Sequence, residues 1–172
     1  DIEDMMNLDI IDVEAATDEW ELDCYSRPVV VEGKKLWEVL ISDSAGSFRF
    51  RSALPSNQVN SKTLRKVVDD LIESDELTVK PNVIRFFRGA MFNMINIALQ
   101  ELPVSAKPSR CTFALASWLE ERHRDVYPTM EGYNANMMTG AGSAPSFLNV
   151  RTPVKLPDAL RGEQYAFVAL PL

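Results

Sequence analysis

Arginines interleaved with aromatic residues are the side chains of this sequence best suited to bind a ligand. The set spans residues 25 to 127 and comprises Arg27, Arg49, Arg51, Arg85, Arg88, Arg110, Arg122 and Arg124, with Tyr25, Phe86, Phe87, Trp118 and Tyr127. Guanidinium groups can hold phosphates while bases stack on rings, so this mixture is typical of nucleic-acid binding. A second interpretation stays open, in which most of the rings belong to the core and most of the arginines pair with acids.

Catalytic chemistry would need a different set of residues. A ribonuclease H-like nuclease brings several carboxylates together on two divalent metal ions, one of them on the first strand of the sheet. Asp23 occupies that position, but Arg85 and Arg88 stand where a second acid is expected. We therefore expect Asp23 to pair with Arg27 or Arg49, and we predict that the chain is not an enzyme.

The sequence also lacks the motifs that bind metals or cofactors. The lone histidine, His123, has no Cys or His at ligand spacing, and Cys24 and Cys111 form neither a metal motif nor a disulfide framework. The sequence contains no glycine-rich phosphate loop and no Gly-x-Ser-x-Gly elbow. We predict no cofactor and no metal, and the two free cysteines fit a reducing compartment.

Charge is unevenly distributed along the 172 residues. The net charge is −7, but residues 1–23 hold ten acids and no Lys or Arg, which leaves 15 acids against 18 bases in the rest. We expect residues 1–19 to be an acidic, disordered head, and residues 20–172 to form one α/β domain. An alternative role for the head is to imitate phosphates and inhibit binding.

No apolar run reaches the length of a membrane span, and nothing at the start resembles a signal peptide. The chain starts without a methionine and stops after an apolar, strand-like run. We expect it to be a piece of a longer precursor.

Alternating apolar and polar residues predict three antiparallel strands early in the domain. They cover residues 20–25, 36–41 and 48–51, and Pro28 should confine the first to a sheet edge or a strand end. One face of this meander is predicted to be wet and to carry the polar set Asp23, Tyr25, Arg27, Arg49 and Arg51.

Helical periodicity follows. Leu64, Val67, Val68, Leu71 and Ile72 predict a helix that Asn60 or Ser61 caps. The apolar run 83–87 reads as a central strand, residues 91–102 as a helix that Pro103 ends, and 104–107 as a short strand.

The last third of the chain begins with a helix. Ser109 is predicted to cap it, its apolar stripe includes Trp118, and Pro128 ends it. A long loop is expected at 129–161, and a final strand at 165–170. The fold class is thus α/β (α+β), with a mixed sheet in the order βββ-α-β-α-(β)-α-loop-β, which suggests a ribonuclease H-like topology.

Several short segments, in order along the chain, resemble the Tab/Atab family of RNA-binding translation activators of chloroplasts and cyanobacteria. They are Trp20-Glu21-Leu22-Asp23, Ser26-Arg27-Pro28, Gly33-Lys34-Lys35-Leu36-Trp37-Glu38, Asn60-Ser61-Lys62-Thr63-Leu64, Ile84-Arg85-Phe86-Phe87-Arg88, Ser117-Trp118-Leu119-Glu120-Glu121-Arg122, Val126-Tyr127-Pro128, Ala166-Phe167-Val168 and Leu170-Pro171. The chain is similar to the N-terminal half of such a protein. It departs from the family at Cys111, at Gly89-Ala90-Met91-Phe92 and in its longer 129–161 loop.

The resemblance implies a non-catalytic RNA-binding domain in the chloroplast stroma. It also implies binding of the A/U-rich 5′ leader of a photosystem I reaction-centre mRNA, within a large complex of protein subunits. A rival hypothesis is a scaffold domain that holds protein partners of a translation complex, and a degenerate ribonuclease H-like nuclease is a further alternative.

The predicted RNA contacts centre on the carboxyl end of the strand at 83–87. Arg88 and Arg110 should face one groove there, with Arg27 as a weaker third, because ligands collect at the carboxyl ends of parallel strands and at helix starts. Arg85, Tyr25, Arg49 and Arg51 complete the predicted RNA-binding set. Trp118 is predicted to lie in the core.

Overall fold

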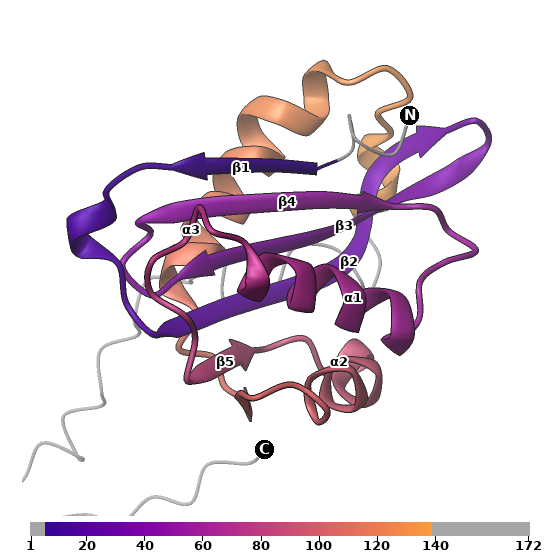
Figure 1. Cartoon of the computed structure of the whole chain (residues 1–172). Coiled ribbons are helices and arrows are strands. Elements are labelled where there is room, and N and C mark those ends of the chain that lie inside the picture. The colour runs from indigo at the N-terminus through magenta and orange to yellow at the C-terminus, as the bar shows by residue number, and fades with distance from the viewer. Residues whose placement is uncertain (1–5, 139–172) are drawn as a thin grey trace, which may run out of the picture.

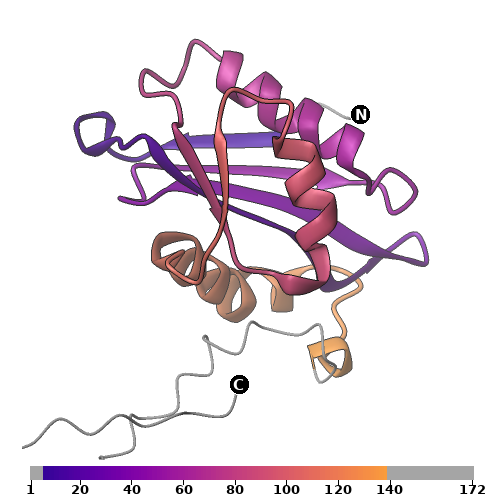
Figure 2. The ribbon, with the colours of Figure 1, turned by 90° about the horizontal axis from the view of Figure 1, so that it is seen from below.

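A computed structural model describes residues 6–138, and all structural statements below refer to that part of the chain. Its centre is a six-stranded mixed sheet with the strand order β1-β4-β3-β2-β5-β6. Helices α1 and α2 cover one face of this sheet, and helix α3 covers the other (Figures 1 and 2). The predicted mixed α/β (α+β) class is confirmed.

The predicted meander is present, with longer strands than expected. It consists of β2 (Glu19–Val31), β3 (Lys34–Asp43) and β4 (Phe48–Leu54), each antiparallel to the next. The first hairpin turns at Glu32 and Gly33, both with positive φ, as a two-residue turn between twisted strands requires. These strands bury Trp20, Leu22 and Ile41 on the face that α1 and α2 cover.

The position of Pro28 differs from the prediction. β2 lies inside the sheet, and Pro28 falls where the β2–β3 register shifts, between Ser26 and Val30. β5 pairs only with residues 19–21 of β2, so the sheet tolerates a residue without an N–H at this bulge. The outer half of β2 instead contacts the segment around Gly132, whose φ of +83° and contact with the Val30 carbonyl leave no room for a Cβ.

Helix α1 (Ser61–Glu73) matches its prediction closely. Asn60 is the N-cap, and its side chain accepts a hydrogen bond of 2.9 Å from the Thr63 N–H. Its five buried residues are the five that the helical spacing indicated. Local periodicity and capping suffice here because the helix presents one continuous apolar stripe.

The two remaining strands both run parallel to β2. β5 (Val83–Phe86) pairs with β2, and β6 (Ser105–Pro108) pairs with β5. Between them lies α2 (Phe92–Leu99), which is shorter than the predicted 91–102. Met91 belongs to a preceding 3₁₀ turn (Gly89–Met91), and the helix ends three residues earlier than predicted. Strands β4-β3-β2-β5-β6 are compatible with a ribonuclease H-like topology, although β2 and β3, rather than β5, occupy the centre.

Helix α3 (Phe113–Glu121) starts three residues later than predicted. Thr112, not Ser109, is its N-cap residue, and Arg110 therefore precedes the helix. The chain continues through a π-helical turn (Arg122–Val126) and a 3₁₀ turn (Tyr127–Thr129). A further 3₁₀ turn (Ala135–Met138) lies within the predicted 129–161 loop, while the rest of that loop and the predicted strand at 165–170 lie outside the described residues.

The acidic head is not disordered over residues 6–19. Strand β1 (Met6–Ile10) pairs antiparallel with β4 at the sheet edge, and a 3₁₀ turn (Val13–Ala15) capped by Asp12 follows it. Met6, Leu8 and Ile10 alternate with polar residues, and Leu8 packs against the main core. The sequence prediction missed this alternation because it was based on the many acidic residues of the segment.

None of the helices in residues 6–138 is both long and apolar enough to span a membrane.

Candidate functional site

The face of the meander that was predicted to be wet is buried beneath α3. Leu115, Trp118 and Leu119 of that helix form a second core with Leu40, Ala53 and other residues of the sheet. Trp118 is 6% exposed, which confirms its prediction as a core residue. Charged side chains on this face are therefore enclosed between the sheet and α3.

These enclosed residues form what we call the buried charge cluster: Asp23, Arg27, Glu38, Arg51, Arg88, Arg122 and Tyr127. Asp23 and Glu38 have no exposed surface, and Arg27 is 2% exposed. A buried charge is tolerated only when it is paired and hydrogen-bonded, and this cluster supplies those partners over several elements.

Asp23 is held by two guanidinium groups. Its Oδ2 accepts hydrogen bonds of 2.9 Å from Arg27 Nη1 and from Arg88 Nη2, and its Oδ1 accepts one of 2.7 Å from Arg88 Nε. Burial by itself would raise the pKa of Asp23, but Arg88 and Arg27 outweigh burial and hold the pKa below its ordinary value. The predicted pairing of Asp23 with Arg27 is confirmed, whereas Arg49 is not its partner.

Glu38 is the second buried carboxylate of the cluster. Its Oε2 accepts hydrogen bonds from Arg27 Nε at 3.2 Å and from the Tyr127 hydroxyl at 2.6 Å. Its Oε1 accepts from Arg51 at 3.2 Å and from Arg122 at 2.8 Å. Burial opposes ionisation, but Arg27 and Arg122 dominate and lower the pKa of Glu38, while burial raises the pKa of Tyr127 to about 12.

Arg27 is thereby excluded from direct contact with a ligand in this structure. The prediction that it faces a groove with Arg88 and Arg110 is wrong, because its guanidinium is enclosed and donates to Asp23 and Glu38. Arg88 retains only 10% side-chain exposure and lies over the ring of Tyr25, 4.0 Å from its centroid. This arrangement joins β5 to β2.

The other predicted arginines also have carboxylate partners. Arg49 forms a two-pronged pair with Glu121 of α3, at 3.1 and 3.0 Å, and lies over Trp118. Arg85 pairs with Glu19 across the parallel β2–β5 ladder. Arg49, Arg51 and Arg85 keep side-chain exposures of 30%, 25% and 17%, so each side chain is still partly exposed to solvent.

The sequence predicted free N–H groups at the start of this helix, but the first turn of α3 does not offer them. Glu21 of β2 reaches it, and the Leu115 N–H donates a 2.7 Å hydrogen bond to Glu21 Oε2. Burial raises the pKa of Glu21 to about 7. Because a carboxylate of the sheet already occupies this helix start, a phosphate cannot bind there.

Arg110 is different from all of these. Of the arginines in residues 6–138, Arg110 is the one for which the structure shows no ion pair, hydrogen bond or ring contact. It is exposed, in the segment that joins β6 to α3, and it lies close in sequence to the exposed Lys107 and Phe113. We call residues 107–113 the β6–α3 connection.

Sequence reasoning missed Phe113, which is 75% exposed. A signal was present, because Phe113 falls off the apolar stripe of residues 111, 115, 118, 119, 122 and 126. A large ring outside the stripe of an amphipathic helix is expected to face solvent.

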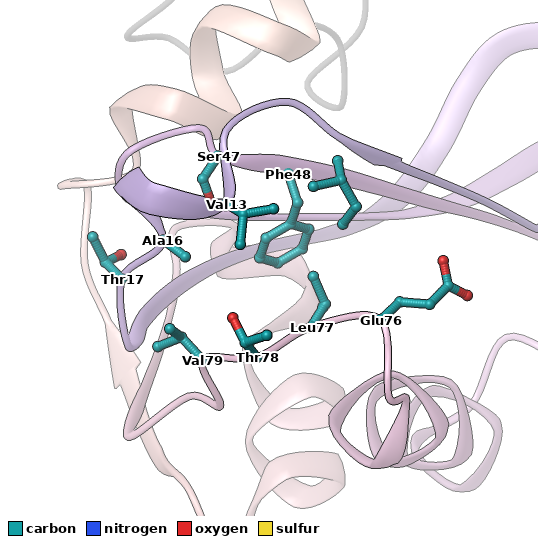
Figure 3. A pocket seen from close by; sticks show the side chains of 10 residues that line it. Val13, Ala16, Thr17, Ser47, Phe48, Glu76, Leu77, Thr78 and Val79 are labelled. Atoms are coloured by element: carbon teal, nitrogen blue, oxygen red, sulfur yellow. The ribbon is translucent and has the colours of Figure 1, made fainter.

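A pocket beside the end of β1 and the start of β4 is too small to hold a substrate. It lies between the segment before β2, the start of β4 and the segment after α1, and Val13, Phe48, Leu77 and Val79 line it (Figure 3). Its volume of about 20 Å³ suits a single water molecule. Within residues 6–138, no group of three or more Cys, His, Asp or Glu side chains is placed to hold a metal ion.

Comparison with known proteins defines the class to which this arrangement belongs. The model of the family described as RNA-binding protein Tab2/Atab2 N terminal matches residues 19–122, which comprise the sheet from β2 onwards and all of α3. The chain therefore belongs to this RNA-binding family, and the resemblance inferred from the sequence is confirmed.

Two relatives of this chain share one name with each other. The chain is 39% identical over 155 residues to "Protein TAB2 homolog, chloroplastic" of Zea mays, covering 89% of this chain and 38% of the relative. It is 37% identical over 169 residues to the protein of that name from Arabidopsis thaliana, covering 95% of this chain and 43% of the relative. The chain spans about two fifths of the length of these curated relatives.

Proposed function

We propose that this chain acts in the chloroplast as the RNA-binding domain of a translation activator and performs no catalysis. Its RNA is the A/U-rich 5′ leader of a photosystem I reaction-centre mRNA, bound in the stroma together with protein subunits of a larger complex. Family membership supports the RNA partner, and the printed names of the two relatives support the chloroplast. The leader, the stroma and the complex rest on the family resemblance.

The observation that carries the proposal is the unpaired charge of Arg110. A phosphate contact requires a cation that is exposed and not already neutralised, and Arg110 meets both conditions. Lys107 is also exposed and has no ion pair in the described part of the chain. Arg85, Arg49, Arg51, Arg88 and Tyr25 stay in the proposed RNA-binding set, since each of these side chains keeps some exposure.

The test is a filter-binding titration with A/U-rich single-stranded RNA over a salt series. Replacing Arg110 and Lys107 by Gln should weaken binding and flatten the log–log salt slope by about 1.4, at roughly 0.7 for each lost phosphate contact. The matched control is Lys34→Gln with Lys62→Gln, which removes the same charge from exposed lysines elsewhere. Parental affinity and slope in the Arg110 and Lys107 variant would contradict this assignment.

A scaffold function is the second candidate, and the edge strand β1 favours it. Met6 and Ile10 of β1, and Ile11 and Val13 beyond it, are 40–57% exposed and lie at a sheet edge that no other strand of residues 6–138 pairs with. Exposed strand edges with apolar residues pair readily with another chain. A parental chain that fails to bind RNA at low salt would favour this function.

Asp23 is the residue at which the nuclease alternative can be tested. Both of its carboxylate oxygens accept hydrogen bonds from guanidinium groups, which stand where a nuclease would place its metal ions. We expect no cleavage of RNA or RNA–DNA hybrids with added Mg²⁺ or Mn²⁺. Cleavage that disappears in Asp23→Asn would overturn the non-catalytic proposal.

A further inference from the structure

Phe113 is the most exposed of the large apolar side chains in residues 6–138, at 75%. The next values are 57% for Ile11 and 56% for Val13, both near the sheet edge at β1. Exposing a phenylalanine ring to this extent leaves apolar surface in water that folding did not bury. The ring is available to a ligand because it contributes little to the core.

The backbone that carries Phe113 is held on both sides. Before it, the Ser109 N–H donates to the Phe86 carbonyl at 2.9 Å, and the Ser109 hydroxyl accepts from the Cys111 N–H at 3.0 Å. After it, the Leu115 N–H is fixed to Glu21, and the neighbouring Thr112 is fully buried. A ring on such a fixed segment loses little conformational freedom when a flat ligand stacks on it.

Exposed positive charge lies in the same segment. Arg110 is three residues before Phe113, and the exposed Lys107 lies opposite Arg85 in the β5–β6 ladder. An exposed ring in the same short segment as exposed cations is complementary to a nucleotide, whose base offers a flat face and whose phosphate offers a negative charge.

We propose that Phe113 stacks against one unpaired RNA base while Arg110 contacts an adjacent phosphate. This inference rests on the proposed RNA binding and deepens it, because it specifies single-stranded RNA with at least one accessible base at this point. In a duplex the base faces are stacked on one another, so a duplex offers the phosphate but not the base.

The test uses the 172-residue chain with Phe113→Leu, which keeps an apolar side chain and removes the ring. We expect about a tenfold loss of affinity for single-stranded RNA, with the salt slope unchanged, because stacking releases no counterions. Arg110→Gln should flatten the slope instead. Phe92→Leu, at a 40% exposed phenylalanine on the opposite face of the sheet, is the control and should bind as the parent does.

A second variant gives a readout that does not depend on affinity. Phe113→Trp should retain binding, and its fluorescence should be quenched by single-stranded RNA and not by duplex RNA of the same sequence. Of the three native tryptophans, Trp20 and Trp118 are buried and Trp37 is half-buried, so the parental chain titrated in parallel gives the background to subtract.

The possible outcomes distinguish base stacking on Phe113 from RNA binding by the chain as a whole. If Phe113→Leu binds with the parental affinity while Arg110→Gln flattens the slope, the stacking inference is wrong and the RNA-binding proposal stands. If the parental chain binds no RNA at any salt concentration, the proposed function fails and the stacking inference fails with it. Quenching by duplex RNA as strong as that by single strands would also overturn the stacking inference.

Discussion

The buried charge cluster and the β6–α3 connection contain the same kinds of residue and use them in opposite ways. In the cluster, Arg27 and Arg88 neutralise Asp23, and rings such as Tyr25 cover the guanidinium groups. In the connection, Arg110 has no ion pair with any residue in 6–138, and Phe113 is 75% exposed. Arginine next to an aromatic residue therefore indicates a binding surface only after the partners within the fold have been counted.

The largest effect should come from breaking the cluster at Glu38. Glu38→Ala removes the acceptor shared by Arg27, Arg51, Arg122 and Tyr127 and leaves Arg27 enclosed with one partner fewer. We expect a loss of roughly 3–5 kcal/mol in the free energy of unfolding, measured by urea denaturation.

The control for that prediction is Glu121→Ala. Glu121 also pairs with an arginine, but its side chain is 44% exposed, so its loss should cost less than about 1 kcal/mol. Equal costs for the two variants would show that burial does not distinguish the cluster from a surface ion pair.

A pH-dependent effect should follow at Glu21, which joins β2 to the first turn of α3. Burial raises the pKa of Glu21 from its ordinary 4.5 to about 7, with Asp43 adding to the rise and Arg85 opposing it. The carboxyl is protonated in both states below pH 4.5 and ionised in both above pH 7. Its contribution to stability therefore falls as the pH rises between these values, by up to about 3 kcal/mol.

Glu21→Gln removes this titration and keeps an oxygen for the Leu115 N–H. The variant should gain stability over the parent as the pH rises from 4.5 to 7 and keep that gain above pH 7. Thermal melts of both chains across this range measure the difference, in which the titration of other groups cancels. Glu120→Gln, at an exposed residue of the same helix, should show no such pH-dependent gain.

A smaller effect is expected at the sheet edge. Leu8 of β1 is partly buried against the main core, so Leu8→Ala should lower the free energy of unfolding by about 1 kcal/mol. Ile11→Ala, at a residue 57% exposed, should leave it nearly unchanged. No difference between these variants in urea denaturation would support the disordered head that the sequence predicted.

The smallest effect on stability is expected in the β6–α3 connection. Arg110→Gln and Phe113→Leu should change the free energy of unfolding by less than about 0.5 kcal/mol, because neither side chain is packed or paired. The same variants should weaken RNA binding, which is the reverse of the result expected for a purely structural residue. A loss of several kcal/mol in the free energy of unfolding of either variant would show that its side chain stabilises the fold, as the residues of the buried charge cluster do.

Local patterns predicted much of the fold. The stripe of α1 and its Asn60 cap, the strands of the meander, and the strands β5 and β6 were all predicted from spacing, residue type and turn residues. Boundaries that depend on distant contacts were less accurate. α3 begins at Phe113 because Glu21, 94 residues before Leu115 in the chain, binds its first turn.

The candidate site was less predictable than the fold. Seven residues were predicted to bind RNA, and the structure encloses Arg27 and pairs Arg49, Arg51, Arg85 and Arg88 with carboxylates. Arg110 alone among the predicted arginines has no partner in the described residues. The pairs of Arg49 with Glu121 and of Arg88 with Asp23 join residues 72 and 65 positions apart, so no local window reveals them.

The sequence by itself determined the elements, the family and the kinds of residue available for binding RNA. Periodicity and capping act over a few residues, and short motifs identify a family without a fold. Only the tertiary structure decided which charges remain free. Placing α3 over the sheet enclosed Asp23 and Glu38, and an enclosed carboxylate must draw in guanidinium groups, since the low dielectric of the interior penalises an unpaired charge. Arg110 lies outside this enclosure and stayed available.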